Sequence, residues 1–137
     1  MKANSQAKAK ATEQQALINL IVDSIHDKKG LKVISLNLSD LNDSMADYFI
    51  ICEGTSAPHM RAIADSVTFN VKKETGLYPY HTEGINSTEW VLVDYFDIIV
   101  HIFHKDKREL YQLEDLWGDA NSTLHEPIPD NIPTPLA

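Results

Sequence analysis

The sequence predicts an α/β (α+β) protein in which helices pack on one mixed sheet of about five strands. Short runs rich in Val and Ile, which favour a pleated and buried surface, alternate with longer segments whose apolar residues recur at helical spacing. One pair of runs is joined by a short loop, as antiparallel strands are, and another pair is separated by a helix, as parallel strands are. The 137 residues are enough for a single domain with its own core.

A predicted β-hairpin forms the centre of this sheet. Its strands cover 90–94 and 97–103, and both faces of the second strand are mostly apolar, so we expect a central strand covered on both sides. The reversal at Tyr95-Phe96 lacks the Asn-Gly pair that tolerates positive φ in a two-residue turn. Strain, a binding role or a longer type I turn would each explain this unusual turn.

Periodicity and capping signals predict the elements before the hairpin. The expected elements are, in order, a mobile arm over 1–10, a helix over 12–29, antiparallel strands over 33–38 and 47–53, a helix over 57–75 and a short strand over 77–81. Thr12 and Ser56 are the expected helix N-caps, and Gly30 and Gly76 are the expected stops. We expect the short strand to run parallel to 47–53, because a helix crosses between them.

After the hairpin, the sequence predicts one more helix and a tail. The helix is expected to begin at Asp106, with a capping box completed by Glu109. Its inner stripe is expected to consist of Leu110, Leu113, Leu116 and Trp117. Four of the six prolines lie within 121–137, which predicts disorder there. The predicted organisation is therefore a mobile arm over 1–10, a single domain over 11–120 and a disordered Pro-rich tail over 121–137.

The net charge of −8 lies in the C-terminal part of the chain. Residues 1–82 are balanced, whereas residues 83–137 carry eleven acidic side chains against Lys105, Lys107 and Arg108. An acidic surface repels phosphate backbones, which disfavours direct nucleic-acid binding, and it attracts a basic protein partner. The alternative is that the charge serves solubility alone.

The sequence offers little for catalysis. Cys52 is the only cysteine, so an intrachain disulfide and a multi-cysteine zinc site are excluded, and its strand pattern predicts an inert buried thiol in a reducing cytosol. His101 and His104 fall on opposite faces of a strand, so we expect no shared metal and a core position for His101. No apolar run approaches the length of a membrane-spanning helix. We therefore predict no catalytic residue, no metal and no cofactor.

Two features suggest binding instead. The turn Gly54-Thr55-Ser56 lies between a strand and a helix N-terminus, where free backbone amides could hold a phosphate or where Ser56 could serve as a plain cap. Trp90 is a large aromatic at the start of a strand and near acidic side chains. Such a residue suits an anchor in a partner's pocket, or an ordinary core position.

Five separate motifs follow one another along the chain. They are DYFIICEGTSAPHMRAIAD over 47–65, Glu83-Gly84, W-x-L-x-D over 90–94, DIIVHIF over 97–103 and R-x-L-Y-x-L-E-D-L-W over 108–117. In this order they resemble the ribosomal silencing factor, or Iojap-like, family, and the match extends from about Leu17 to Ala120. The family usually has glycine where this chain has Phe96, which leaves the conformation of the turn open.

The resemblance implies a nucleotidyltransferase-like fold and a homodimer when the protein is free. It also implies binding in the cytoplasm to the large ribosomal subunit, through its basic protein number fourteen, at the face that meets the small subunit. A protein bound there would block subunit joining, lower translation under starvation and assist large-subunit maturation. The fold also supplies an alternative, a degenerate nucleotide-binding protein. An active nucleotidyltransferase needs an Asp-x-Asp pair for Mg²⁺ after its Gly-Ser turn, and none follows Gly54-Thr55-Ser56, so we predict no enzyme activity.

We place the partner-binding surface on the hairpin, where the acidic excess begins and the motifs are densest. The expected contact residues are Trp90, Asp94, Tyr95, Asp97 and His101. A desolvated aromatic and aliphatic patch ringed by carboxylates would anchor and steer a basic partner. We expect no sequence-specific contact to nucleic acid and no membrane association.

Overall fold

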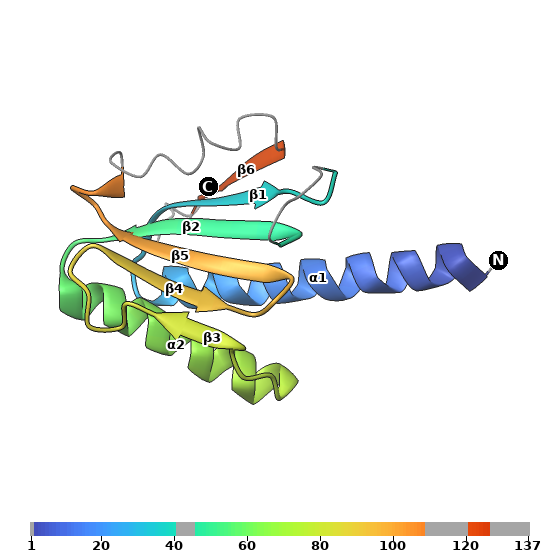
Figure 1. The fold of residues 1–137 in the computed structure, drawn as a ribbon, viewed down its shortest axis with the longest axis horizontal. Helices are drawn as coiled ribbons and strands as arrows, with labels where there is room; N and C mark the ends of the chain where they lie inside the picture. The colour runs from blue at the N-terminus through green and yellow to red at the C-terminus, as the bar shows by residue number, and fades with distance from the viewer. Residues whose placement is uncertain (1, 41–45, 109–120, 127–137) are drawn as a thin grey trace, which may run out of the picture.

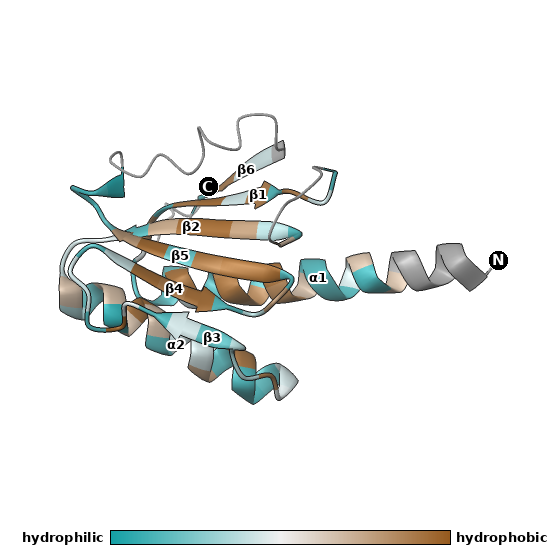
Figure 2. Cartoon of the chain, viewed as in Figure 1, coloured by the Kyte–Doolittle hydropathy of each residue, from teal (hydrophilic) through white to brown (hydrophobic). Residues whose placement is uncertain are grey.

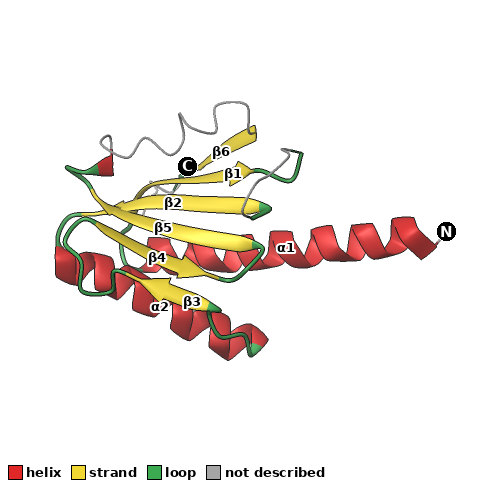
Figure 3. Ribbon diagram, in the orientation of Figure 1, coloured by secondary structure: helices red, strands yellow, loops and turns green. Residues whose placement is uncertain are grey.

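The structure is a computed structural model that describes residues 2–40, 46–108 and 121–126, except for the side chains of 2–8 and 121. Its elements are α1 (Lys2–Asp27), β1 (Leu31–Asn37), β2 (Tyr48–Gly54), α2 (Ala57–Thr75), β3 (His81–Glu83), β4 (Trp90–Asp94), β5 (Ile98–His104) and β6 (Asn121–His125). In this part of the chain, α1 and α2 lie on one side of a six-stranded sheet (Figures 1 and 3). The predicted α/β class is confirmed, with one strand more than expected.

The sheet is mixed, and its strand order is β3-β4-β5-β2-β1-β6. Strands β2 and β5 are parallel to each other, and the other neighbouring pairs are antiparallel. Figure 2 shows hydrophobic residues along much of β2 and β5, and neutral or hydrophilic ones along β3 at the edge. The central position predicted for the second hairpin strand is therefore confirmed, as is the antiparallel return from β1 to β2.

Alternate residues of the central strands belong to two separate apolar clusters. The helix-side cluster joins α1 and α2 to four strands, and it takes Ile98, Val100 and Ile102 from β5. The opposite-face cluster takes Ile99 and Phe103 from the same strand. Both faces of β5 are thus buried, as its two apolar faces predicted.

The helix ends agree in part with the predicted caps. Ser56 accepts a backbone N–H at the start of α2, and Gly76 ends that helix at a φ of 79°. At the end of α1 the residue with positive φ is Lys29, at 62°, rather than Gly30. A Cβ added to Gly30 would lie 2.3 Å from Cγ2 of Ile25, so this position needs glycine because there is no room for a side chain.

The predicted N-terminal arm is helical. Helix α1 begins at Lys2 and passes through Thr12 without an N-cap there, so the expected break at that residue is wrong. Residues 3–11 are mostly Ala, Lys and Gln, which have high helix propensity even without an apolar period. The helix extends well beyond the edge of the sheet in Figure 1. At the point where it leaves the sheet, Gln14 Nε2 donates a 2.7 Å hydrogen bond to Asp47.

The short strand expected over 77–81 is shifted along the chain. Strand β3 covers His81–Glu83 and pairs with β4. Pro79 has no N–H to offer a sheet ladder, which accounts for the later start. Strand β3 is antiparallel to β4, β4 is antiparallel to β5, and β5 is parallel to β2, so β3 runs in the same direction as β2, as the helical crossover predicted. The two strands are not neighbours, however, because β4 and β5 lie between them.

The predicted disorder over 121–137 is wrong at its beginning. Residues Asn121–His125 form β6, which pairs antiparallel with β1 at the other edge of the sheet. A hydrogen bond of 2.8 Å joins Ser35 Oγ and His125 Nε2. All four prolines of the segment 121–137 come after β6, so the composition of the whole segment gave no sign of the short strand at its beginning. The helix predicted from Asp106 is described only to Arg108, where residues 106 and 107 form a turn and Arg108 is helical; its stripe over 110–117 and the tail from 127 onward lie outside the described residues.

Candidate partner-binding face

An aromatic group lies on the sheet face opposite the helices, at the end where β4 begins. Trp90 pairs with Phe103 across β4 and β5, and their rings stack with centroids 5.1 Å apart. His101 lies two residues before Phe103 and so on the same face, with its ring edge-on to that of Phe49 at 4.5 Å. We call Trp90, His101, Phe103 and Phe49 the Trp90 cluster. Within it Trp90 is half-buried and the other three are buried.

One hydrogen bond joins the polar atoms of this cluster. The indole N–H of Trp90 donates to Nδ1 of His101 at 3.1 Å. Nδ1 must therefore be unprotonated, which puts the ring proton of a neutral imidazole on Nε2. His101 is 2% exposed, and burial lowers its pKa to about 4, so the imidazole is neutral at physiological pH. The predicted core position of His101 is confirmed, and its side chain lies beneath the surface that a partner could touch.

A buried ion pair borders the Trp90 cluster. Arg108 Nη1 lies 3.2 Å from Glu53 Oε2, and each side chain is 6% exposed. Glu53 is the residue of β2 that pairs with Phe103, so the carboxylate lies on the same face as the Trp90 cluster. Arg108 also donates to the backbone carbonyl of Lys32 at 2.7 Å. Glu53 was not among the predicted site residues. Its carboxylate in an otherwise apolar strand is nevertheless a signal in the sequence, because buried charges need partners.

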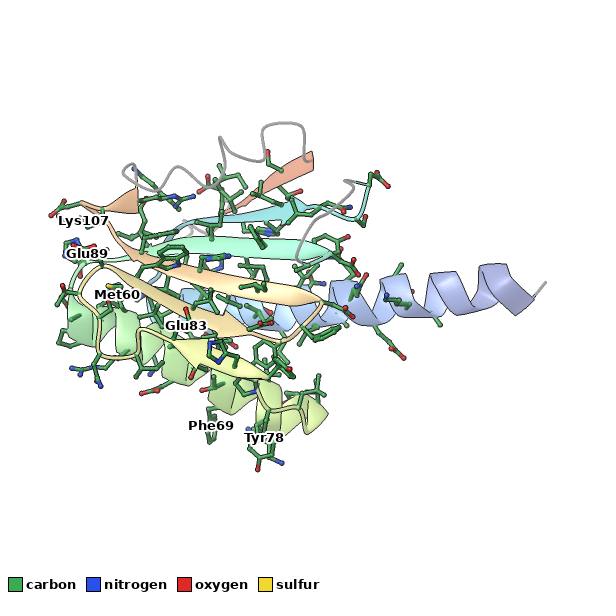
Figure 4. The ribbon with its side chains drawn as sticks, viewed as in Figure 1. Met60, Phe69, Tyr78, Glu83, Glu89 and Lys107 are labelled. Carbon is green, nitrogen blue, oxygen red and sulfur yellow. The ribbon has the colours of Figure 1, made fainter. Side chains whose placement is uncertain are left out.

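Charged side chains also lie on the exposed rim next to Trp90. Glu89 directly precedes Trp90, and its Oε1 is 3.9 Å from Nζ of Lys107. Figure 4 shows Glu89 and Lys107 together at this end of the sheet, away from Phe69 and Tyr78 on the helix side. Glu89 and Lys107 thus form a partly exposed acidic and basic pair at the end of the sheet where β4 begins.

The turn residues of the predicted site lie at the other end of β4. Asp94 Oδ1 accepts the N–H of Phe96 at 2.6 Å, and Asp97 donates its N–H to the carbonyl of Tyr95 at 3.0 Å. Between them Phe96 has a φ of 78°, a conformation that favours glycine. The turn is therefore a tight one, and Phe96 occupies a strained position in it.

The predicted contact residues do not form one compact patch. Strand periodicity puts Asp94 on the face of Trp90, but the two are four residues apart, which is about 13 Å at the usual rise along a strand. Tyr95 packs against the helix-side cluster, and burial raises the pKa of its phenol to about 12. Asp97 is half-buried, and its backbone carbonyl accepts N–H groups from Asp47 and Tyr48. Trp90 and His101 touch each other at one end of the hairpin, and Tyr95 and Asp97 are joined by a backbone hydrogen bond at the other end.

The turn Gly54-Thr55-Ser56 serves as a helix cap in this structure. The N–H of Thr55 donates to Nδ1 of His59 at 2.9 Å, and the N–H of His59 donates to the Ser56 hydroxyl at 3.2 Å. Nε2 of His59 in turn donates to the carbonyl of Lys28 at 2.7 Å, which matches a single neutral tautomer. The backbone N–H groups of Thr55 and His59, which a bound phosphate would need, therefore already have hydrogen-bond partners within the protein.

A metal-binding cluster and a membrane-spanning helix are both absent from the residues that the structure describes. Among them no group of three or more His, Cys, Asp or Glu side chains is arranged to hold a metal ion. None of the helices described there has the length and apolar character that crossing a bilayer requires. Cys52 is buried as predicted, and burial raises the pKa of its thiol to about 12.

Comparison with known proteins points to one family. The family model described as "Ribosomal silencing factor during starvation" matches residues 10–135. A ribosomal silencing factor from Halalkalibacterium halodurans is 42% identical over 106 residues, which cover 77% of this chain and 89% of that protein. A mouse protein named for mitochondrial assembly of the ribosomal large subunit is 37% identical over 76 residues, covering 52% of this chain and 32% of that protein.

Solved structures agree with these sequence matches. A crystal structure of a protein from Chromobacterium violaceum superposes with a TM-score of 0.71 at 36% identity, covering 76% of this chain and 85% of that chain. The similarity therefore extends to the fold as well as to the motifs.

Proposed function

This chain belongs to the ribosomal silencing factor family, and from that premise we propose that it binds the large ribosomal subunit through the subunit's basic protein number fourteen. Bound there, it blocks the small subunit from joining sterically and so represses translation, without catalysis. The mouse relative's name supports a second role in large-subunit biogenesis. We propose that the protein acts in the cytoplasm and is a homodimer when free, which analytical ultracentrifugation would test.

The observation that carries this proposal is the Trp90 cluster. Its indole is large, half-buried and held rigidly by Phe103 and His101, so little conformational entropy remains to be lost when a partner covers it. The net charge of −8 favours a basic partner, and Asp94 and Asp97 at the far end of the hairpin would steer it. In this proposal Trp90 is the anchor, the two carboxylates and Tyr95 form a second contact region, and His101 acts from beneath.

Replacement of Trp90 by alanine tests the anchor. Losing a central aromatic anchor costs about 2 kcal/mol or more of binding free energy, which corresponds to at least roughly thirtyfold weaker binding. We expect that loss when the variant is sedimented with purified large subunits at low salt. Phe69→Ala is a matched control, because Phe69 is 67% exposed on α2, behind the other face of the sheet.

Melting temperatures of both variants separate anchoring from folding. If folded Trp90→Ala bound large subunits as tightly as wild type, Trp90 would not belong to the binding site. If wild type itself ran free of large subunits at low salt, the silencing proposal would fail.

The alternative is nucleotide binding at Gly54-Thr55-Ser56, a short Gly-Ser turn at the N-terminus of α2. It has less support, because His59 engages two groups of this turn. Thermal stabilisation by a nucleoside triphosphate with Mg²⁺ would favour this alternative.

A further inference from the structure

The orientation of Trp90 depends on two contacts with β5. Phe103 stacks beneath the ring, with its plane at 29° to the indole, and His101 accepts the indole N–H. Stacking alone would also accept the indole flipped by about 180° about its Cβ–Cγ bond, because the flipped ring lies in nearly the same plane. The hydrogen bond removes that freedom, since it requires the N–H edge to point at Nδ1.

The imidazole of His101 is itself held in place. Its ring lies edge-on to Phe49, with an interplanar angle of 67°, and nearly parallel to that of Phe103, at 7°. Nε2 has no hydrogen-bond partner within the part of the chain that the structure describes. A buried donor without a partner costs stability, so packing alone does not account for a histidine here. An aliphatic side chain of similar volume would avoid that cost.

We propose that His101 is a positioning residue: it holds the indole of Trp90 in the orientation in which the ring meets the partner, and it does not touch the partner itself. This inference rests on the proposed function of the Trp90 surface. A neutral, buried imidazole remains an acceptor throughout the physiological pH range, so the orientation is permanent.

The hydrogen bond between Trp90 and His101 also limits which groups of a partner can bind the indole. Because the indole N–H is already donated to His101, it is not available to an acceptor on the partner. The partner therefore meets carbon atoms of the ring. The groups of a basic protein that suit such a surface are the aliphatic stems of Lys and Arg, and their cationic ends placed over the ring.

Two substitutions separate positioning from packing. His101→Asn keeps an acceptor oxygen close to the place of Nδ1, whereas His101→Leu conserves apolar volume and removes the acceptor. The first readout needs no partner: the NMR signal of the Trp90 indole N–H, assigned by its loss in Trp90→Phe. We expect His101→Leu to shift this signal upfield and speed its exchange with solvent, and His101→Asn to leave it close to wild type. An unchanged signal in His101→Leu would overturn the proposal.

The second readout is binding to purified large subunits. We expect His101→Leu to bind about three- to tenfold more weakly, the effect of one lost hydrogen bond, and His101→Asn to bind within about twofold of wild type. In a Trp90→Phe background, which has no indole N–H to orient, His101→Leu should cause no further loss. An equal loss in both backgrounds would mean that His101 acts by another route, against the proposal. Failure of the wild type to bind would refute the proposed function instead, and the NMR comparison would still decide whether His101 orients the indole.

Discussion

The two faces of the sheet are built from the same strands but differ in chemistry. The buried members of the helix-side cluster are Ile, Val, Met, Ala and Cys, without a buried aromatic ring or charge. The opposite face holds Phe49, Phe103 and the half-buried Trp90, together with His101 and the Glu53–Arg108 pair. Burial of aliphatic groups is non-directional, whereas each polar group on the other face depends on one partner at one distance.

This difference separates two tasks within one small domain. Helix packing on the aliphatic face can tolerate a change of shape if the volume is conserved. The opposite face cannot, because removing a partner there leaves a buried charge or donor alone. Fold stability therefore draws on both faces, and we propose that a partner is recognised on the face without helices.

The largest expected effect is on the buried ion pair. Arg108→Met removes the cation and leaves the Glu53 carboxylate buried without it, which should lower the free energy of unfolding by about 3–5 kcal/mol. Urea denaturation measures this loss. On the helix side, Ile63→Val removes one methylene from a fully buried site and should cost only about 0.5–1.5 kcal/mol.

A double variant sharpens the same comparison. Glu53→Leu together with Arg108→Met replaces both charges by apolar groups, so most of the loss should be recovered, apart from the hydrogen bond to the Lys32 carbonyl. If Arg108→Met were no more damaging than Ile63→Val, the contrast between the two faces would not hold.

Acid should destabilise the protein through His101. Its pKa is about 4 in the folded protein, against the ordinary histidine value of 6.5 in the unfolded chain, so only the unfolded chain binds a proton between these values. Stability is therefore unaffected above pH 6.5 and falls as the pH is lowered towards 4, by up to roughly 3 kcal/mol at 1.36 kcal/mol per pKa unit. Urea denaturation of wild type and His101→Leu at pH 7 and pH 4.5 measures the difference.

The control for this pH series is Phe69→Ala, which removes an exposed side chain that does not titrate. It should keep the acid sensitivity of wild type. His125, whose pKa is also lowered by burial, contributes in the same direction, so the test is the difference between wild type and His101→Leu. Equal acid sensitivity in those two proteins would contradict the buried, neutral state of His101.

Local signals predicted most elements of the fold. Ser56, Gly76 and the apolar alternation of β5 were sufficient for α2 and for the central strand, because these signals lie within the elements themselves. Strand β6 was missed because its stability depends on pairing with β1, about 90 residues earlier in the chain. The start of α1 was missed because propensity, rather than periodicity, extends that helix.

The site was predicted less completely, and the reason is strand register. The size and position of Trp90 made it the proposed anchor, and that role stays a prediction. Its bond to His101 exists because Trp90 pairs with Phe103 and so lies diagonal to His101. The register of a hairpin is set by its turn, and this turn has a positive φ at Phe96. A glycine at that position would have been a sequence signal for such a turn, whereas phenylalanine is not. Glu53 and Arg108 lie 55 residues apart, so no local pattern connects them.

The smallest expected effect concerns that turn, which connects β4 and β5. Phe96 has a φ of 78°, and its side chain is 69% exposed. Its ring lies edge-on to that of Tyr80, with the two ring centroids 5.8 Å apart. Glycine would relieve the backbone strain of the folded state, which would stabilise the protein by about 1 kcal/mol. It would also make the unfolded chain more flexible, which would destabilise the folded protein by about half that amount or more. We therefore expect Phe96→Gly to raise the free energy of unfolding by at most about 1 kcal/mol. Phe96→Asn should lie between glycine and Phe96→Ala, since Asn tolerates positive φ better than alanine does. Urea denaturation of the three variants measures the order, and an alanine variant more stable than the glycine variant would show that the turn is not strained at Phe96.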